Sequence, residues 1–371
     1  MTMKYSLNKS FTFATLLLLV FIPQQELYGL QVTGLYSHRV AVSNESDSER
    51  NRAFQEAFKA VVVKITGSRS WLSDPNIEQA IARAQSYVEA IRYESQNADE
   101  FLYNDIDGPG SLSENRFIEV SFSGSLIQTL LADANIPIWN SNRPSVLIWM
   151  VLQDSSGTRS LLTKESNPEI SGYFLNFAKI RAIPIIFPVL DFEDRRNLSE
   201  EDVWTLDTEK ITKASLRYGA DSILSGRLLF TGGGDLIGLW QFIFRDEADV
   251  FDGVENNLND YLEMPLDRIT NRLANYFAVV SDSTPQETVK LKIEGIRSLG
   301  AYRSLMNYVS GLGLVYSVKA SNLDSGTLQL ELDLLGEAAQ LFEVIALDRD
   351  LMPIQSFQAG DRDSLHYRWT R

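Results

Sequence analysis

The sequence contains no cysteine among its 371 residues and only two histidines, His38 and His366. The absence of cysteine excludes disulfide bonds, thiolate nucleophiles, cysteine-ligated zinc, iron–sulfur clusters and the lipid-modified cysteine of a bacterial lipoprotein. Two histidines near opposite ends of the chain argue against a Ser-His-Asp triad and against a multi-histidine metal site. We therefore expect no cofactor, and the composition favours a protein that is not an enzyme.

Basic residues are also scarce. The chain has 34 Lys and Arg residues against 49 Asp and Glu residues, which gives a formal net charge of −15. An acidic surface repels phosphate backbones and anionic lipid headgroups, so nucleic acid and anionic membranes are disfavoured as partners. The remaining composition, 44% hydrophobic and 22% charged, is typical of globular proteins. A chain of this length is expected to form two or three domains, each with its own core.

Residues 1–29 have the pattern of a signal peptide. Lys4 and Lys9 precede a twelve-residue apolar stretch, 11–22, which is too short to span a bilayer as a helix. Cleavage after Gly29 is expected, and an uncleaved inner-membrane anchor is the alternative. The sequence therefore predicts export to the periplasm.

Residues 30–140 are expected to form an N-terminal α+β module. Apolar side chains that recur every four positions up to Ile65 predict a helix, and Gly67 ends it. A second helix begins at Asp74-Pro75, a capping residue followed by proline, and its apolar face extends to Ile91. The expected elements are strand 31–43, helix 53–65, helix 75–91, strand 116–122 and helix 126–131.

Residues 145–246 are expected to form a middle α/β module. Strands that alternate with helices predict a βαβαβ sheet with parallel strands, and the glycine-rich turn at 231–235 adds an antiparallel hairpin. Pro184 and Pro188 weaken the second strand, because proline has no N–H for the ladder. The expected elements are strand 146–152, helix 169–181, strand 183–190, helix 207–218, strand 223–230 and strand 236–244.

The rest of the chain is expected to hold a connecting segment and a third module. Residues 247–284 are predicted to be an acidic, asparagine-rich surface loop up to 264, followed by an amphipathic helix from Pro265. Residues 287–371 are predicted to form a C-terminal α+β module of split β-α-β type. Its expected elements are strand 289–296, helix 299–312, strand 315–320, strand 327–334, helix 337–347 and a tail strand, 365–371.

Several stretches together resemble a known family. They are 64–72 (Lys-Ile-Thr-Gly-Ser-Arg-Ser-Trp-Leu), 181–194, 202–204 (Asp-Val-Trp), 217–221 (Arg-Tyr-Gly-Ala-Asp) and 226–228 (Gly-Arg-Leu). In this order they resemble the exported bacterial proteins grouped as domain of unknown function 2066, over essentially the whole mature chain. The resemblance implies a gammaproteobacterial envelope protein without an assigned activity or catalytic residues. More distantly, the middle module is similar in architecture to small α/β domains of the Tol-Pal translocation protein B and of curli-secretion-type lipoproteins, and architecture does not fix function.

The stretch 103–114 partly fits a calcium loop. With glycine at position 6, Asp105, Asp107 and Glu114 take positions 3, 5 and 12 of the loop. Position 1 is Tyr103, which supplies no carboxylate, so a polar turn between a helix and a strand is favoured over a metal site.

Asp191, Glu193 and Asp194 follow the second strand of the middle module. Ligands of α/β sheets bind beyond the carboxyl ends of the strands, so these carboxylates are candidates for binding a cation or a sugar, or for acid–base work as a pair. Arg195 and Arg196 follow directly and favour a solvated, ion-paired loop instead.

Export, acidic charge and the lack of a nucleophile favour a non-enzymatic binding or adaptor protein of the cell envelope. Its expected partner is an envelope protein or a cell-wall component. The alternatives are a ligand-binding module at Asp191–Asp194 and a hydrolase that uses these carboxylates. The sequence does not indicate an oligomeric state.

Overall fold

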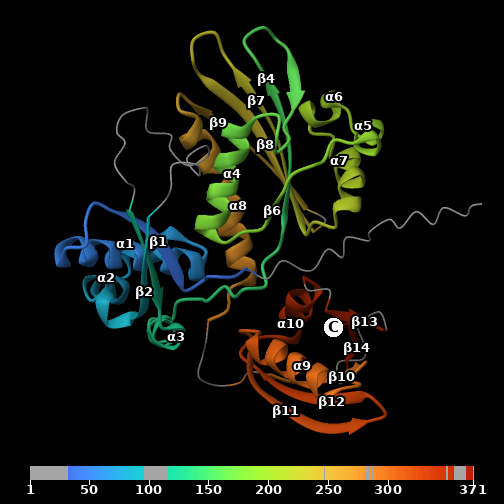
Figure 1. Ribbon diagram of the computed structural model, residues 1–371. Helices are drawn as coiled ribbons and strands as arrows, with labels where there is room; N and C mark the ends of the chain where they lie inside the picture. The colour runs from blue at the N-terminus through green and yellow to red at the C-terminus, as the bar shows by residue number, and fades with distance from the viewer. Residues whose placement is uncertain are drawn as a thin grey trace, which may run out of the picture.

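The computed structural model describes residues 32–95, 116–245, 247–280, 285, 287–347, 350–354 and 365–370. The expected signal peptide at 1–29 lies outside these residues. Three sheets follow one another along the chain, each with its own helices and buried apolar core (Figure 1). The mixed α/β and α+β class expected from the sequence is confirmed.

The N-terminal sheet is antiparallel, in the order β1 (Ser37–Val42), β3 (Arg116–Phe122), β2 (Val88–Ser95). Its helices are α1 (Asp47–Thr66), η1 (Arg69–Ser73), α2 (Pro75–Ala82), η2 (Ala84–Tyr87) and α3 (Gly124–Asp133). The expected helix 75–91 was wrong beyond Ala82. Val88 and Ile91 belong to β2, although their spacing continues the helical pattern of α2.

Helix α1 shows why the prediction for the first helix holds. The hydroxyl of Ser46 accepts from the backbone N–H of Glu49 at 3.3 Å, which caps the amino end. Gly67 ends the helix with φ +74°, a conformation that glycine adopts without strain. Phe58 and Val62 are fully buried, and each contributes about 1.5–3 kcal/mol of hydrophobic stabilisation.

The middle sheet has six strands. Its order is β5 (Arg159–Leu161), β4 (Val146–Gln153), β7 (Ser222–Phe230), β8 (Leu236–Phe244) and β9 (Glu247–Glu255), and the two-residue β6 (Ile185–Ile186) pairs with the start of β4. Strand β4 runs parallel to β6 and β7, and the other pairs are antiparallel. The expected strand 183–190 is therefore reduced to β6, which lies between Pro184 and Pro188.

Strand β9 contradicts the surface loop expected at 247–264. Backbone hydrogen bonds to β8 hold β9 over its whole length, and such bonds do not depend on polar or apolar side chains. Two of its carboxylates also form hydrogen-bonded ion pairs: Asp249 accepts from Arg268 at 3.0 Å, and Glu247 accepts from Arg272 at 2.8 Å. The helix expected from Pro265 is confirmed as α8 (Leu258–Phe277), but it begins seven residues earlier.

Successive residues of β4 point to opposite faces of the middle sheet, and both faces are covered. One face packs against α4 (Pro168–Arg181) and α8. On the other face, Trp149 and its neighbours pack against α6 (Glu200–Trp204) and α7 (Thr208–Ser215), beside α5 (Phe192–Asn197) (Figure 1). Continuous burial from 146 to 152 explains the unbroken apolar run in the sequence.

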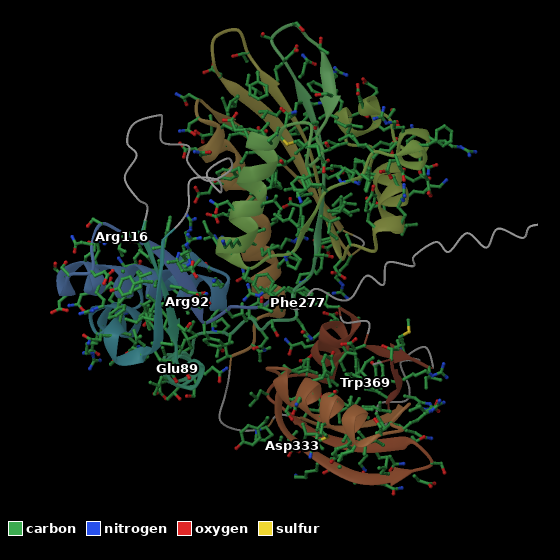
Figure 2. The ribbon with its side chains drawn as sticks, viewed as in Figure 1. Glu89, Arg92, Arg116, Phe277, Asp333 and Trp369 are labelled. Atoms are coloured by element: carbon green, nitrogen blue, oxygen red, sulfur yellow. The ribbon has the colours of Figure 1, made fainter. Side chains whose placement is uncertain are left out.

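The C-terminal sheet has the order β11 (Val315–Asp324), β12 (Thr327–Leu334), β10 (Glu287–Glu294), β14 (Leu365–Trp369), β13 (Leu351–Pro353), and its helices are α9 (Leu299–Gly311) and α10 (Ala338–Ala346). The expected helices and strands of this module are confirmed. Trp369 packs against Tyr308 with ring centroids 5.6 Å apart. Figure 2 shows Trp369 within this module and Phe277 near the centre of the molecule, where α8 ends.

Arg143, in the linker at 140–144, connects the N-terminal and middle modules. Its side chain is buried, and its guanidinium nitrogens lie 2.5 Å from the carbonyl oxygen of Lys64 in α1 and 2.9 Å from that of Arg181 in α4. A third carbonyl, of Trp139, accepts at 2.7 Å. Burial, followed by the neighbouring charge of Arg181, lowers the pKa of Arg143 to about 9.

Arg181 makes a second connection at the same place. It is fully buried, donates to the carbonyl oxygen of Gly67 at 2.7 Å and forms an ion pair with Asp267 of α8. Arg143 and Arg181, together called the arginine joint below, bind carbonyls from the N-terminal module and from the middle module. Removing either guanidinium leaves buried acceptors without donors, so the joint fixes one module against the other.

Candidate functional site

The candidate site is built by the segment 187–194, which runs from the end of β6 into the first turn of α5, and by η4 (Leu216–Tyr218), which precedes β7. Leu190 has φ +53°, a conformation that a branched side chain adopts only when its surroundings hold it there. Three hydrogen bonds do so. The N–H of Val189 donates to the Tyr218 hydroxyl at 2.9 Å, the N–H of Leu190 donates to Asp194 Oδ2 at 2.9 Å, and Arg195 Nε donates to the Leu190 carbonyl at 2.9 Å.

Arg217 is the centre of this arrangement. Its two terminal nitrogens donate to both oxygens of Asp191, at 2.6 and 2.7 Å, and one of them also donates to Asp194 Oδ1 at 2.9 Å. The Tyr218 hydroxyl donates to Asp194 Oδ2, and Asp194 is 1% exposed. We call Asp191, Asp194, Arg217 and Tyr218 the Arg217 latch. A two-pronged Arg–carboxylate pair is among the stronger and more directional polar contacts, so the latch fixes α5 to η4.

The electrostatics of the latch favour permanently charged carboxylates. The hydrogen bonds from Arg217, followed by those from the backbone, hold the pKa of Asp191 well below its ordinary range. The carboxylate pair raises the pKa of Arg217, and burial and the bond to Asp194 raise the pKa of Tyr218. A general acid at neutral pH needs a raised carboxyl pKa, so the environment of Asp191 does not suit that role.

The donors that bind Asp191 are concentrated on one of its two oxygens. The carboxylate accepts from the backbone N–H groups of Glu193 and Asp194, both at 3.0 Å, as well as from both nitrogens of Arg217. Three of these donors bind Oδ1 and one, an Arg217 nitrogen, binds Oδ2, so Oδ1 is filled and Oδ2 keeps acceptor capacity. A ligand of Asp191 would approach Oδ2 beside the Arg217 guanidinium, whose positive charge disfavours a cation there. Glu193 is more exposed and lies 3.7 Å from Arg217.

The latch lies over a face of the middle sheet, not beyond the carboxyl ends of the strands as the sequence suggested. Tyr218 stacks edge-on against Trp149, with ring centroids 6.0 Å apart. Trp149 is in the middle of β4 and is paired with Ser225 of β7. Tyr218, which binds Asp194, therefore connects the latch to the middle of β4.

Three exposed apolar side chains adjoin residues of the latch. Phe192 is 81% exposed, Leu216 is 74% exposed and Val189 is 71% exposed. These are the three highest exposed fractions among the large hydrophobic side chains of the described residues. Each is a direct neighbour of a latch contact, because Phe192 follows Asp191, Leu216 precedes Arg217, and the amide of Val189 is bound by Tyr218. We call these three residues the apolar rim. They expose apolar area on two segments that the latch holds together, which is typical of interaction sites.

The sequence pattern indicates Asp191, Glu193 and Asp194, but it does not indicate Arg217, Tyr218 or the apolar rim. Arg195 and Arg196 are the ion-pair partners expected from the sequence, whereas the partner of Asp191 in the structure is Arg217, 26 residues away. One signal was available: an aromatic residue stands inside the charged run at 191–196.

The other sequence-derived site is outside the described residues. Asp105, Asp107 and Glu114 lie in the stretch 96–115, so the structure gives no geometry for a calcium loop. In the parts of the chain that the structure does describe, no group of three or more His, Asp or Glu side chains is arranged to hold a metal ion. The same parts contain no helix with the length and apolar character needed to cross a bilayer.

Comparison with known proteins gives one family match. Residues 30–140, which hold β1 to α3, match the model of a domain of unknown function (DUF8605). An uncharacterised domain is therefore supported for this part of the chain, although under a different family number from the one the resemblance indicated. No curated protein matches the chain in sequence.

Two solved structures show limited likeness. The C-terminal domain of LpoB from Salmonella enterica is similar over 31% of this chain and 83% of that domain, with 15% identity and a TM-score of 0.21. A crystal structure of an uncharacterised protein is similar over 36% of this chain and 91% of that protein, with 10% identity and a TM-score of 0.17. At these TM-scores neither likeness supports a functional assignment.

Proposed function

We propose that this chain is a non-enzymatic binding or adaptor protein of the bacterial cell envelope, and that the apolar rim holds its partner. The observation that carries the proposal is the exposure of the apolar rim: the three most exposed large apolar side chains of the described residues stand on two segments, 187–194 and η4, that Arg217 joins. Interface centres are enriched in aromatic side chains and depleted of charge.

The latch supports this function through preorganisation. A loop that is already ordered loses less conformational entropy when a partner binds, so more of the contact energy appears as affinity. The three rim residues are apolar, and an apolar pocket on an envelope protein suits them better than a hydroxyl-rich glycan of the cell wall does. We infer that the partner is a protein.

The envelope location rests on the sequence. The pattern at residues 1–29 supports export to the periplasm, and the net charge of −15 disfavours nucleic acid and anionic lipid as partners. We also propose membership of the exported family grouped as domain of unknown function 2066, on the five stretches quoted above. Fractionation of cells that express the full chain with a C-terminal tag tests the location, and a cytoplasmic pool alone would contradict it.

The alternative is a cation or sugar site at Asp191, Glu193 and Asp194. It has a distinct signature, because it depends on the carboxylate of Asp191 and not on the side chain of Phe192. Under the alternative, Asp191→Asn abolishes ligand binding and Phe192→Ser leaves it unchanged. Under our proposal, Phe192→Ser weakens partner binding directly.

The test is co-purification of envelope proteins with the mature chain. We compare the wild type, a Phe192→Ser/Leu216→Ser double variant, and Leu299→Ser as a matched control, since Leu299 is 65% exposed but lies in the C-terminal module. We expect one stoichiometric partner with the wild type and the control, and its loss with the double variant. A partner that is retained by the double variant would refute the apolar rim as the binding surface.

A further inference from the structure

The outer strands of the three sheets are protected in different ways. An unpaired edge strand is a template for another chain, and proteins limit this with short strands, bulges or covering groups. Strands β5, β6 and β13 have two or three residues each. Strand β2 has one register shift and β11 has two. Strand β1 is covered by α1, because Arg52 donates to the carbonyl of Ala41 and Lys64 to that of Ser37.

Strand β9 has none of these three protections, and what limits its pairing is the charge of its acidic side chains. All nine of its residues pair with β8 in one continuous register, from Glu247 opposite Phe244 to Glu255 opposite Leu236. In the described part of the chain, no strand pairs with its other side. Among the described residues it is therefore a long, regular edge whose outward backbone donors and acceptors have no strand partner.

The side chains of β9 limit which strand can pair with it. The strand carries four carboxylates and no basic residue: Glu247, Asp249, Asp252 and Glu255. Glu247 and Asp249 pair with arginines of α8, whereas Asp252 is exposed on the opposite face. Like charges on adjacent strands are destabilising, so a second copy of β9 is disfavoured and a basic strand is favoured.

Apolar side chains flank Asp252 on the same face. Val250 and Val254 stand two residues before and after it, and they are 51% and 65% exposed. Ile237 of β8, directly opposite Val254, is 41% exposed and continues this surface. Helices α6 and α7 pack on this side of the sheet against β4 and β7, and they leave these residues open.

We propose that β9 accepts an extended segment of a protein partner that continues the middle sheet. The segment has a basic residue opposite Asp252 and apolar residues two positions to either side, opposite Val250 and Val254. Main-chain hydrogen bonds provide affinity, and the alternate side chains provide specificity. This surface is separate from the apolar rim, so the chain has two places where partners can bind at once, as an adaptor requires.

The probe is a fluorescent peptide of about ten residues whose central residues are valine, threonine, lysine, threonine and valine. Binding to the full mature chain is measured by fluorescence anisotropy. We expect saturable binding that weakens at least about tenfold when alternate peptide amides are N-methylated, since methylation removes the ladder donors and leaves the side chains. Equal binding of the methylated peptide, or no binding of the parent peptide, would overturn the proposal.

A charge exchange tests the predicted register. We expect Asp252→Lys to weaken binding of the lysine peptide about tenfold and to strengthen binding of a peptide with glutamate at the same position. The matched control is Asp324→Lys on the bulged edge β11, which should leave both affinities unchanged. If Asp252→Lys and Asp324→Lys behave alike, β9 is not the docking strand. Phe192→Ser should not alter peptide binding, so this outcome is independent of the role of the apolar rim.

Discussion

Arg143 and Arg217 are the same residue type in opposite surroundings. Arg143 is buried, donates to neutral carbonyls and has a pKa lowered to about 9 by desolvation. The side chain of Arg217 is 31% exposed, binds two carboxylates and has a raised pKa. The buried guanidinium joins two modules, and the exposed one fixes the segment that presents apolar side chains. The arginine joint therefore fixes one module against the other, and the latch fixes the segments that carry the proposed binding surface.

The largest expected effect follows from removing the buried member of this pair. Arg143→Met leaves the carbonyls of Lys64, Trp139 and Arg181 without their donor, at a cost of about 1–3 kcal/mol for each unsatisfied acceptor. We expect the free energy of unfolding to fall by at least about 3 kcal/mol and the linker at 140–144 to become sensitive to protease. Urea denaturation and limited proteolysis measure both. An unchanged urea midpoint would show that the joint is not structural.

A smaller effect is expected from the exposed member. Arg217→Gln removes the pair with Asp191 and leaves the buried Asp194 with Tyr218 and the N–H of Leu190, and we expect a loss of about 1–2 kcal/mol. The loss should be local. Hydrogen exchange of the α5 amides should accelerate, while that of α9 in the C-terminal module should not. Uniform acceleration in both helices would contradict a local latch.

The latch also predicts a pH dependence. The folded-state pKa of Asp191 lies below the unfolded value of about 3.9, so its stabilising contribution is complete above that pH and is lost as the pH falls further. We expect the stability of the wild type to decline more steeply below about pH 4 than that of Arg217→Gln. Urea midpoints at a series of pH values measure the two slopes. Parallel curves would mean that Arg217 does not lower this pKa.

The smallest effect on stability is expected at the apolar rim. Phe192 is 81% exposed, so Phe192→Ser should change the free energy of unfolding by no more than about 0.5 kcal/mol. Partner binding should nevertheless fall strongly, since anchors of this kind cost about 2 kcal/mol or more when truncated. Thermal denaturation and co-purification separate the two effects. A variant that binds normally would remove Phe192 from the interface.

Local sequence patterns predicted much of the fold. The four-residue apolar spacing and Gly67 located α1, and the unbroken apolar run located β4. The helix prediction was wrong at Val88 and Ile91, where the helical spacing of apolar residues continues by chance into β2. The loop prediction was wrong in β9, where backbone pairing with β8 forms a strand despite the acidic side chains.

The candidate site was predictable only in part. Asp191 and Asp194 stood out because carboxylates follow a strand, but their partner Arg217 is far along the chain and belongs to another element. No local spacing encodes that contact, since it exists only after α5 and η4 pack on the same face of the sheet. The exposure of Phe192 follows from the same packing.

The central claim is that Arg217 prepares the apolar rim for a protein partner. The most direct measurement is photo-cross-linking in intact cells, with Phe192 replaced by a photoreactive phenylalanine analogue, in the wild type and in Arg217→Gln. We predict one adduct of defined mass in the wild-type background, strongly reduced in Arg217→Gln and absent when the analogue replaces Leu299. An adduct of equal yield with and without Arg217, or one that forms equally from position 299, would contradict the account.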